Sequence, residues 1–207
     1  MFVLKVEART ARPDAVRHQV LAWPADVGSS ASGWLGCTGG VSADGDWIFL
    51  MRFVSQEAAW ITSDLPGYEQ WWRACRRHLE TPPVFTESTR VSGILRGGTD
   101  DAAAVIITQG SAPPNRLRDS LRRLETLALT ERVGVIGGFV AWHDRERFTE
   151  ALYLASKGAQ FRQLGTTSQP LGRFIDDHVA AVRDARVIDL DEPWLTSPGS
   201  PHTRETQ

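Results

Sequence analysis

The sequence predicts an α+β protein made of two similar halves. Two observations support this: a hairpin pattern that occurs twice, and a regular succession of strand-like and helix-like segments around each copy. Residues 33–60 and 131–161 both run from a glycine-rich strand through a polar turn into an apolar strand that ends at a serine. The two Gly-Gly pairs lie 98 positions apart and the two serines 101, so one short insertion in the turn would align the copies. A repeat of this length indicates a duplicated structural unit.

The first half is expected to contain strand, helix, strand, strand, helix and strand. Residues 2–9 alternate in period two, as a half-buried strand does. Pro13 opens a short helix that Pro24 is expected to end. Two strands, 34–42 and 46–54, are joined at an Asp-Gly turn that suits a tight hairpin. A helix with an apolar stripe is predicted at Tyr68–Leu79, and residues 84–95 supply a closing strand.

The second half repeats that order. A strand at 103–108 precedes a helix that Pro114 opens, with Leu117, Leu121, Leu124 and Ala128 in one stripe. The hairpin spans 133–156. The remaining apolar positions predict a second helix carrying Phe174, Ile175, Val179 and Val182, and a last strand at 185–190.

We therefore expect one repeat at residues 1–96, a second at 102–195, and a disordered tail at 196–207 that has nothing to bury. Each repeat has the order βαββαβ, which gives an antiparallel four-stranded sheet with two helices on one face. The other face of such a sheet stays apolar and uncovered. We expect the two repeats to cover these faces by packing sheet to sheet.

Composition limits the classes of function. The chain has 207 residues, 42% of them hydrophobic, including eight tryptophans, so it can bury a sizeable core. A net charge of -2 and a pI of about 6.2 lack the basic field that nucleic acid requires. Cys37 and Cys75 form no metal or disulfide pattern, which indicates a reducing compartment, taken as the cytoplasm. No signal peptide or membrane-spanning segment is expected.

Four segments carry a resemblance to a known family. They are Gly33-Trp34-Leu35-Gly36, Arg52-Phe53-Val54-Ser55-Gln56-Glu57-Ala58-Ala59, Gln70-Trp71-Trp72 and Gly137-Gly138-Phe139-Val140-Ala141-Trp142-His143. With the βαββαβ order, they resemble the dimeric α/β-barrel superfamily of ferredoxin-like folds, which includes antibiotic-biosynthesis-monooxygenase-like proteins. The closest patterns are those of uncharacterised bacterial proteins in which one chain supplies both halves. The resemblance covers roughly residues 1–195 and implies an intramolecular α/β barrel.

The resemblance implies a small-molecule-binding protein and, if it is an enzyme, a cofactor-independent monooxygenase or a polyketide-type cyclase of secondary metabolism. The alternative is a non-catalytic ligand-binding or interaction protein, and haem binding through His143 is a third interpretation. We expect an aromatic ligand, no cofactor, no metal, no nucleic acid and no membrane partner. The chain would act as a monomer that forms a pseudo-dimer, or as a homodimer.

Three residues are candidates for catalysis. His143 ends a predicted strand, where it could act as an acid, a base or a haem ligand, or simply cap the hairpin turn. Arg52 and Glu150 lie inside predicted strands, near corresponding places in the two hairpins, where a buried charge needs a partner. They could move a proton or hold an enolate. The structural alternative is an ion pair such as Arg52 with Glu7, or exposure at a sheet edge.

Large aromatic side chains are candidates for substrate binding. Trp34, Trp47, Trp72, Trp142 and Tyr153 could wall a pocket for a flat ligand, or pack in the core. Gly39-Gly40 and Gly137-Gly138 are expected to mark bulges or close backbone approach in the sheet. His178 is interpreted as a solvated residue near a helix end. The chain contains no nucleophile elbow, dinucleotide fingerprint or zinc-protease motif.

Overall fold

A computed structural model describes residues 1–199, which divide into two compact units. The first unit consists of Met1–Arg90 and the segment that begins at Pro193, and the second is Val91–Glu192. Of the tail predicted at 196–207, Thr196 ends a strand, and residues from 200 onward lie outside the described part of the chain.

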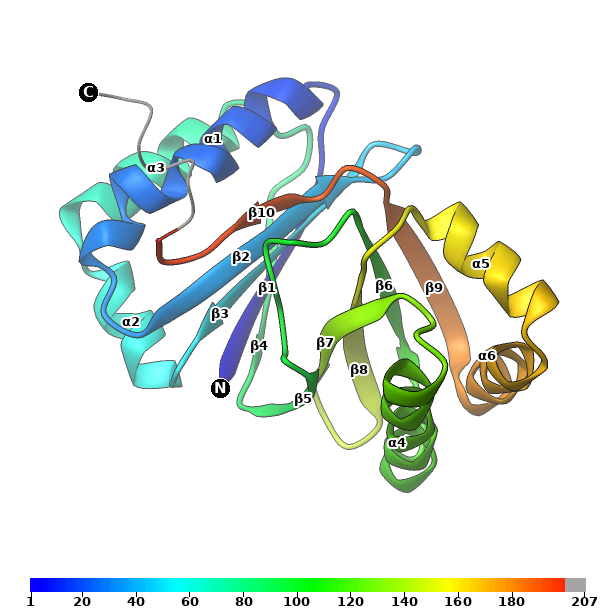
Figure 1. Cartoon of the computed structure of the whole chain (residues 1–207). Coiled ribbons are helices and arrows are strands. Elements are labelled where there is room, and N and C mark those ends of the chain that lie inside the picture. The colour runs from blue at the N-terminus through cyan, green and yellow to red at the C-terminus, as the bar shows by residue number, and fades with distance from the viewer. Residues whose placement is uncertain (200–207) are drawn as a thin grey trace. The chain divides into compact units, whose positions relative to one another are not determined.

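The first unit is a five-stranded sheet with helices on one face (Figure 1). Its strand order is β10-β2-β3-β1-β4, and each neighbouring pair is antiparallel. The strands are β1 (Phe2–Arg9), β2 (Trp34–Val41), β3 (Asp46–Phe53), β4 (Val84–Ser88) and β10 (Trp194–Thr196). The helices are α1 (Pro13–Asp26), α2 (Gln56–Ser63) and α3 (Pro66–Arg76), with a 3-10 turn at Gly28–Ser30.

The second unit repeats this plan with the strand order β5-β7-β8-β6-β9. Its strands are β5 (Arg90–Leu95), β6 (Ala104–Ser111), β7 (Val135–Trp142), β8 (Arg147–Leu154) and β9 (Arg183–Leu190). Its helices are α4 (Pro114–Thr130), α5 (Gly158–Thr167) and α6 (Gln169–Ala181). The predicted α+β fold of two ferredoxin-like repeats is thus confirmed. The packing of one sheet on the other stays a prediction.

Each unit buries its own core between its sheet and its helices. In the first unit the core is rich in aromatic side chains, with Trp23 of α1 and Trp71 of α3 against Phe49 of β3. In the second unit it is mainly aliphatic, with Leu117 and Leu124 of α4 against the sheet. On α4 the predicted stripe is the buried one at Leu117, Leu121 and Leu124. The core divides every strand into a helix-facing set of residues and an opposite set, and this decides where each candidate side chain lies.

The fifth strand of each sheet comes from the other half of the sequence, which was not predicted. The single strand expected at 84–95 is interrupted at Thr89, so that β4 pairs with β1 while β5 joins β7. Likewise β10 comes after β9 in the chain but pairs with β2. Each half therefore completes the hydrogen-bonded edge of the other half's sheet. An alternating pattern predicts a strand but not its partner, since pairing is a long-range choice.

Two short helices, α2 and α5, were also missed. Each comes directly after a hairpin and precedes the longer helix of its repeat. Ser55 begins α2 by accepting a hydrogen bond from the backbone N–H of Ala58 at 3.1 Å, which is the N-cap arrangement expected of serine. Pro24 proves to lie inside α1, which continues to Asp26. Proline here removes one hydrogen bond, which an N–H at position 24 would donate to the carbonyl of Val20, and the helix ends two residues later.

The alignment of the two hairpins differs from the one predicted. Trp34 pairs with Phe53, and Val135 pairs with Leu154, so the whole hairpin repeats with an offset of 101 residues and without an insertion. The Gly-Gly pairs are therefore not equivalent to each other. The bulges fall at Trp34/Gly36 and Val135/Gly137, which means that Gly39-Gly40 lies in regular strand and was wrongly predicted as a bulge.

Candidate functional site

The tryptophans predicted to bind substrate in the first unit lie in its core. Trp34 contacts Trp23, with ring centroids 6.3 Å apart, and Trp47 stacks on Phe49 at 5.7 Å. Trp72 contacts Trp47 at 6.3 Å and meets further aromatic rings of α3 and β4. All three predicted residues are buried, so they act first as packing groups.

The two aromatic candidates of the second unit lie on opposite faces of its sheet. Trp142 packs against Phe148 on the helix-facing side, with ring centroids 5.6 Å apart. Tyr153 is fully buried on the other face, beside Phe139 at 6.3 Å. The structure therefore does not gather the five predicted binding residues around one point of either unit.

His143 lies at the start of the β7–β8 turn. Its Nε2 is 2.7 Å from Oγ1 of Thr149, and its backbone N–H donates to Arg147. Asp144 caps the turn by accepting backbone hydrogen bonds from Arg147 and Glu146 at 2.8 and 2.9 Å. These bonds, with that from Arg147 the strongest, hold the pKa of Asp144 below its usual range. Asp144 therefore caps the turn, and His143 contacts Thr149 beside it.

Arg52 and Glu150 do not occupy corresponding places, contrary to the prediction. By strand register Arg52 matches Tyr153, and Glu150 matches Phe49. Arg52 lies on the face of β3 away from the helices, between the core residues Met51 and Phe53. The ion pair of Arg52 with Glu7, which the sequence offered as a structural alternative, is not formed among residues 1–199, and Glu7 contacts Lys5 at 2.6 Å.

Glu150 is the candidate that the structure places in a defined chemical setting. It is 0% exposed and lies on the helix-facing side of β8, next to Val140 and Thr108 on the neighbouring strands. Its Oε2 is 3.1 Å from Nε2 of His178 on α6. On the other side of the imidazole, Nδ1 is 3.1 Å from Oγ of Ser120 on α4. A carboxylate, an imidazole and a hydroxyl thus form a chain from the sheet to both helices.

The electrostatics of this chain favour a charged imidazole. Burial has the largest single effect on the pKa of His178 and lowers it. The negative charge of Glu150 and the direct contact with that carboxylate together outweigh burial, so the net effect is a raised pKa. Nε2 and Oε2 are close without being aligned as a hydrogen bond, and neither carboxylate oxygen has a hydrogen-bond partner in residues 1–199. A fully buried carboxylate with unused acceptor sites is rare in proteins. It is suited to accept a proton from something else.

The first repeat fills the same layer without these groups. Phe49 stands in place of Glu150. Gln19 stands in place of Ser120, because each lies six residues after the proline that opens its helix, Pro13 in α1 and Pro114 in α4. His178, four residues after a buried aromatic residue of α6, corresponds to the buried Cys75 of α3. Because the first unit builds the same helix-facing layer without a carboxylate or an imidazole, the Glu150–His178 pair is not a requirement of the fold.

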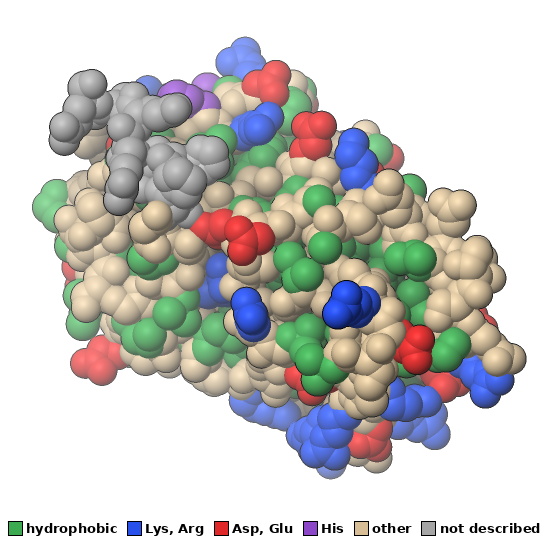
Figure 2. Space-filling view, viewed as in Figure 1, with side chains coloured by type: hydrophobic (Ala, Val, Ile, Leu, Met, Phe, Trp, Pro, Cys, Tyr) green, Lys and Arg blue, Asp and Glu red, His purple; other side chains and the backbone are tan. Residues whose placement is uncertain are grey.

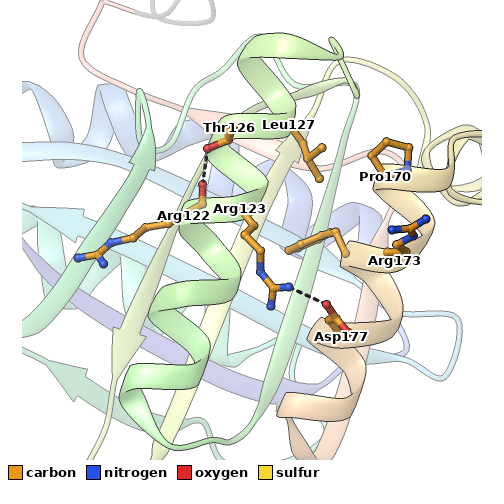
Figure 3. Close-up of a pocket in the computed structure, with 8 residues that line it drawn as sticks. Arg122, Arg123, Thr126, Leu127, Pro170, Arg173 and Asp177 are labelled. Atoms are coloured by element: carbon orange, nitrogen blue, oxygen red, sulfur yellow. Dashed lines mark hydrogen bonds and ion pairs between the residues drawn. The ribbon is translucent and has the colours of Figure 1, made fainter.

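A groove between α4 and α6 lies on the outer side of this chain. It has a volume of about 540 Å³ and is lined by Arg122, Arg123, Thr126, Leu127, Pro170, Arg173, Phe174 and Asp177. Figure 3 shows Arg123 reaching across to Asp177, 2.6 Å away, while Arg122 points away from α6. Phe174 lines the groove and also contacts the ring of His178, with centroids 5.4 Å apart. The side chain of Phe174 therefore lies between the groove and the imidazole of His178.

Basic side chains surround this groove. Figure 2 shows basic side chains gathered in the region of α4, whose basic residues are all arginines, and Arg116 lines a smaller depression beside the groove, of about 310 Å³. Within the described chain Arg173 has no ionic partner. A positive potential at the mouth of a groove raises the local concentration of anionic ligands.

The arrangement suits proton transfer better than acyl transfer. A hydroxyl, an imidazole and a carboxylate are also the groups of a hydrolytic triad, but Ser120 lies in the middle of α4, where the backbone amides are used by the helix. The donors needed to hold an oxyanion are therefore lacking at Ser120. Among residues 1–199, no group of three or more His, Cys, Asp or Glu side chains is placed to hold a metal ion. No helix in that range is long and apolar enough to span a membrane.

Comparison with solved structures identifies proteins that have the same fold. A protein of Lactobacillus acidophilus that is provisionally named a monooxygenase matches with a TM-score of 0.71 at 10% identity, covering 95% of this chain and 96% of its own. A Fusobacterium nucleatum protein with a similar provisional name gives 0.69 at 7% identity, covering 91% of each chain. The chain shares the fold of these proteins. An anthrone oxidase-like protein gives 0.56 at 12% identity, covering 91% of this chain and 90% of its own.

These matches span nearly the whole of both chains, so the tandem form is shared and not only the single repeat. No protein-family model and no curated protein sequence matches the chain. The resemblance drawn from the sequence is thus confirmed at the level of fold.

His178 was wrongly interpreted as a solvated residue, since it is 9% exposed and lies on the buried face of α6, and Ser120 was not singled out from the sequence. The stripe predicted for α6 used Ile175 and Val179, whereas the buried residues are Leu171, Phe174 and His178. Val179 is in fact exposed. The signal that could have found His178 is its position four residues after Phe174 and seven after Leu171, which places it on one face with two apolar residues.

Proposed function

We propose that the protein is a small-molecule enzyme in which Glu150 removes a proton from an acidic C–H or O–H group of an aromatic substrate. The observation that carries this proposal is the buried Glu150–His178–Ser120 chain, which occurs in the second repeat and is replaced by Phe49, Cys75 and Gln19 in the first. A charge that the fold does not need, in a position that disfavours charge, is a mark of a functional site.

In this mechanism the two side chains have different tasks. Glu150 accepts the proton, because its oxygens have acceptor sites that no residue of 1–199 uses. His178 is a positioning residue: Ser120 holds its Nδ1, and its Nε2 lies 3.1 Å from Oε2 of Glu150. Exclusion of water strengthens the attraction between this pair and an anionic transition state.

The names of the structural neighbours suggest a reaction that proton removal would start. For an anthrone, loss of a proton gives an electron-rich anion that reacts with dioxygen. Overall a CH₂ group and O₂ give a C=O group and one molecule of water, so the carbon loses four electrons, O₂ gains four, and no separate reductant is needed. A cyclase would use the same base to form an enolate that closes a ring. Both reactions fit a cofactor-independent enzyme.

The test is oxygen consumption with anthrone as the probe, using the full-length protein. The proposal expects anthraquinone formation by the wild type and a loss of about 100-fold or more in Glu150→Gln, since general base catalysis contributes 10²–10⁴-fold. Glu131→Gln is the matched control, because Glu131 is exposed and lies at the end of α4. Equal rates in wild type and Glu150→Gln would refute the role of Glu150.

A second candidate is a ligand-binding protein without catalysis. The observation that favours it is depth: His178 is only 9% exposed, and Phe174 packs on its ring below the groove. This candidate predicts that anthrone raises the melting temperature of the protein without being consumed. Binding and turnover measured on the same sample separate the two candidates.

A further inference from the structure

The groove between α4 and α6 carries more positive charge than its own ion pairs use. Three arginines and one aspartate line it, so positive charge is in excess. Arg123 pairs with Asp177 at 2.6 Å, and Arg122 lies 3.8 Å from Asp119 on its own helix. Arg173 is exposed and forms no ion pair or hydrogen bond among residues 1–199. Arg173 is therefore the cation of the groove whose guanidinium is available to a ligand.

Apolar surface lies next to this cation. Figure 3 shows Leu127 of α4 pointing toward α6, on which Pro170 and Arg173 lie. Leu127 is half-buried and Pro170 is exposed, so both present apolar surface to the groove. Phe174 is 5% exposed and closes the groove toward His178. The volume of about 540 Å³ lies within the range of about 300–1,000 Å³ that is usual for small-molecule sites. The groove thus offers a small molecule an apolar wall and one free guanidinium.

The first repeat has a depression at the corresponding place, with a different charge. It lies between α1 and α3 and has a volume of about 250 Å³. The equivalence of α1 with α4 matches Asp26 to Leu127, and that of α3 with α6 matches Gln70 to Arg173. The residues that line the depression of the first repeat include an aspartate but neither lysine nor arginine. Because the fold forms this depression without arginine, the positive charge of the groove in the second repeat is not a structural requirement.

We propose that this groove binds a small aromatic carboxylate, with the carboxylate on Arg173 and the ring against Leu127 and Pro170. The planar guanidinium can donate hydrogen bonds to both oxygens of a carboxylate at once. One free guanidinium matches a single negative charge, whereas a phosphate dianion suits a cluster of free cations. The ring covers apolar surface that otherwise faces water. Binding here does not require Glu150 to remove a proton, so it is independent of the proposed reaction.

The binding test is isothermal titration calorimetry of the full-length protein with 2-naphthoate. Arg173→Gln introduces the residue that the first repeat has at this place, and it should weaken binding by at least about tenfold, the loss expected for one hydrogen bond to a charged group. Arg118→Gln is the matched control, because it removes the same charge from an exposed position of α4 that lines neither depression of the second unit. This control should bind 2-naphthoate as the wild type does. Absence of binding by the wild type, undiminished binding by Arg173→Gln, or equal losses in the two variants would overturn the proposal.

Two analogues test the chemistry of the ligand. 2-Naphthamide keeps the rings without the charge, and acetate keeps the charge without the rings. Each should bind at least about tenfold more weakly than 2-naphthoate, and equal affinity of either would overturn the assignment of an aromatic carboxylate. Because 2-naphthoate has no CH₂ group from which a proton could be removed, it measures binding alone. Failure of anthrone oxidation would therefore leave this site standing, and loss of 2-naphthoate binding would leave the role of Glu150 standing.

Discussion

Replacement of His178 by glutamine should destabilise the second unit strongly, because it leaves Glu150 as a buried carboxylate without a counterion. Nε2 and Oε2 lie 3.1 Å apart, and at an effective dielectric constant of about 20 this separation corresponds to an attraction of about 5 kcal/mol. Removal of one partner from a buried pair costs about 3–5 kcal/mol in mutational studies. The two figures agree, so we expect His178→Gln to lower the free energy of unfolding by about 3–5 kcal/mol.

The complete double-mutant cycle separates charge from shape. Glu150→Gln should cost less, about 1.5–3 kcal/mol, because the remaining imidazole can become neutral. The double variant should be more stable than the sum of the single losses predicts, by at least about 1 kcal/mol, because no isolated charge is left. Urea unfolding followed by circular dichroism measures all four proteins. Additive losses would refute the reasoning that the pair is electrostatically coupled.

The same cycle has a defined pH dependence. The pKa of His178 is raised in the folded protein, so its contribution to stability is fully present below the unfolded value of 6.5 and is lost as pH rises through the folded pKa. The difference in stability between wild type and His178→Gln should therefore be larger at about pH 6 than at about pH 9.5. A difference that is constant or grows with pH would show that the imidazole is not held in its charged form.

Three other predictions rest on single contacts. In Glu150→Gln, the pKa of His178 should fall below 6.5, since burial then acts alone, and an NMR titration of the imidazole would show no such fall if the charge of Glu150 were unimportant. Burial raises the pKa of Cys75 to about 12, so iodoacetamide at about pH 8 should label it in urea and not in the folded protein; labelling of the native chain would contradict its burial. Gly137→Ala should lower the melting temperature clearly, because the new methyl group would collide with the carbonyl oxygen of Gly97, and an unchanged melting curve would show that this contact is not tight.

The sequence was most informative where a pattern is local and repeated. The hairpins and the stripe of α4 could be predicted from periodicity, which reflects the side of an element that meets its own core. Glu150 could be singled out because a carboxylate inside an apolar strand is unusual. Its partner His178 could not be predicted, because it lies 28 positions away and neither residue indicates which helix will lie over β8. The exchange of β5 and β10 is equally invisible, since a strand's pattern is the same whichever sheet it joins.

The offset between the hairpins shows how a plausible local match can mislead. The two Gly-Gly pairs look equivalent, yet backbone pairing matches Gly137 with Gly36 and leaves Gly39-Gly40 opposite an ordinary strand segment. What the two repeats share is the bulge and the glycine beside it. The requirement is for backbone conformation at one position, not for a particular dipeptide.

Tandem duplication gives each repeat a freedom that identical subunits lack. In a symmetric dimer every buried charge occurs twice, so its cost to stability is doubled. Here Arg52 occurs only in the first repeat, and its counterpart in the second repeat is Tyr153. Glu150 occurs only in the second repeat, and its counterpart in the first repeat is Phe49. Each destabilising group is thus present once, in a unit whose twin keeps a neutral residue at that position. If the substitutions were exchanged by Phe49→Glu and Glu150→Phe, the first unit should be destabilised, because Cys75 offers its new carboxylate no positive partner.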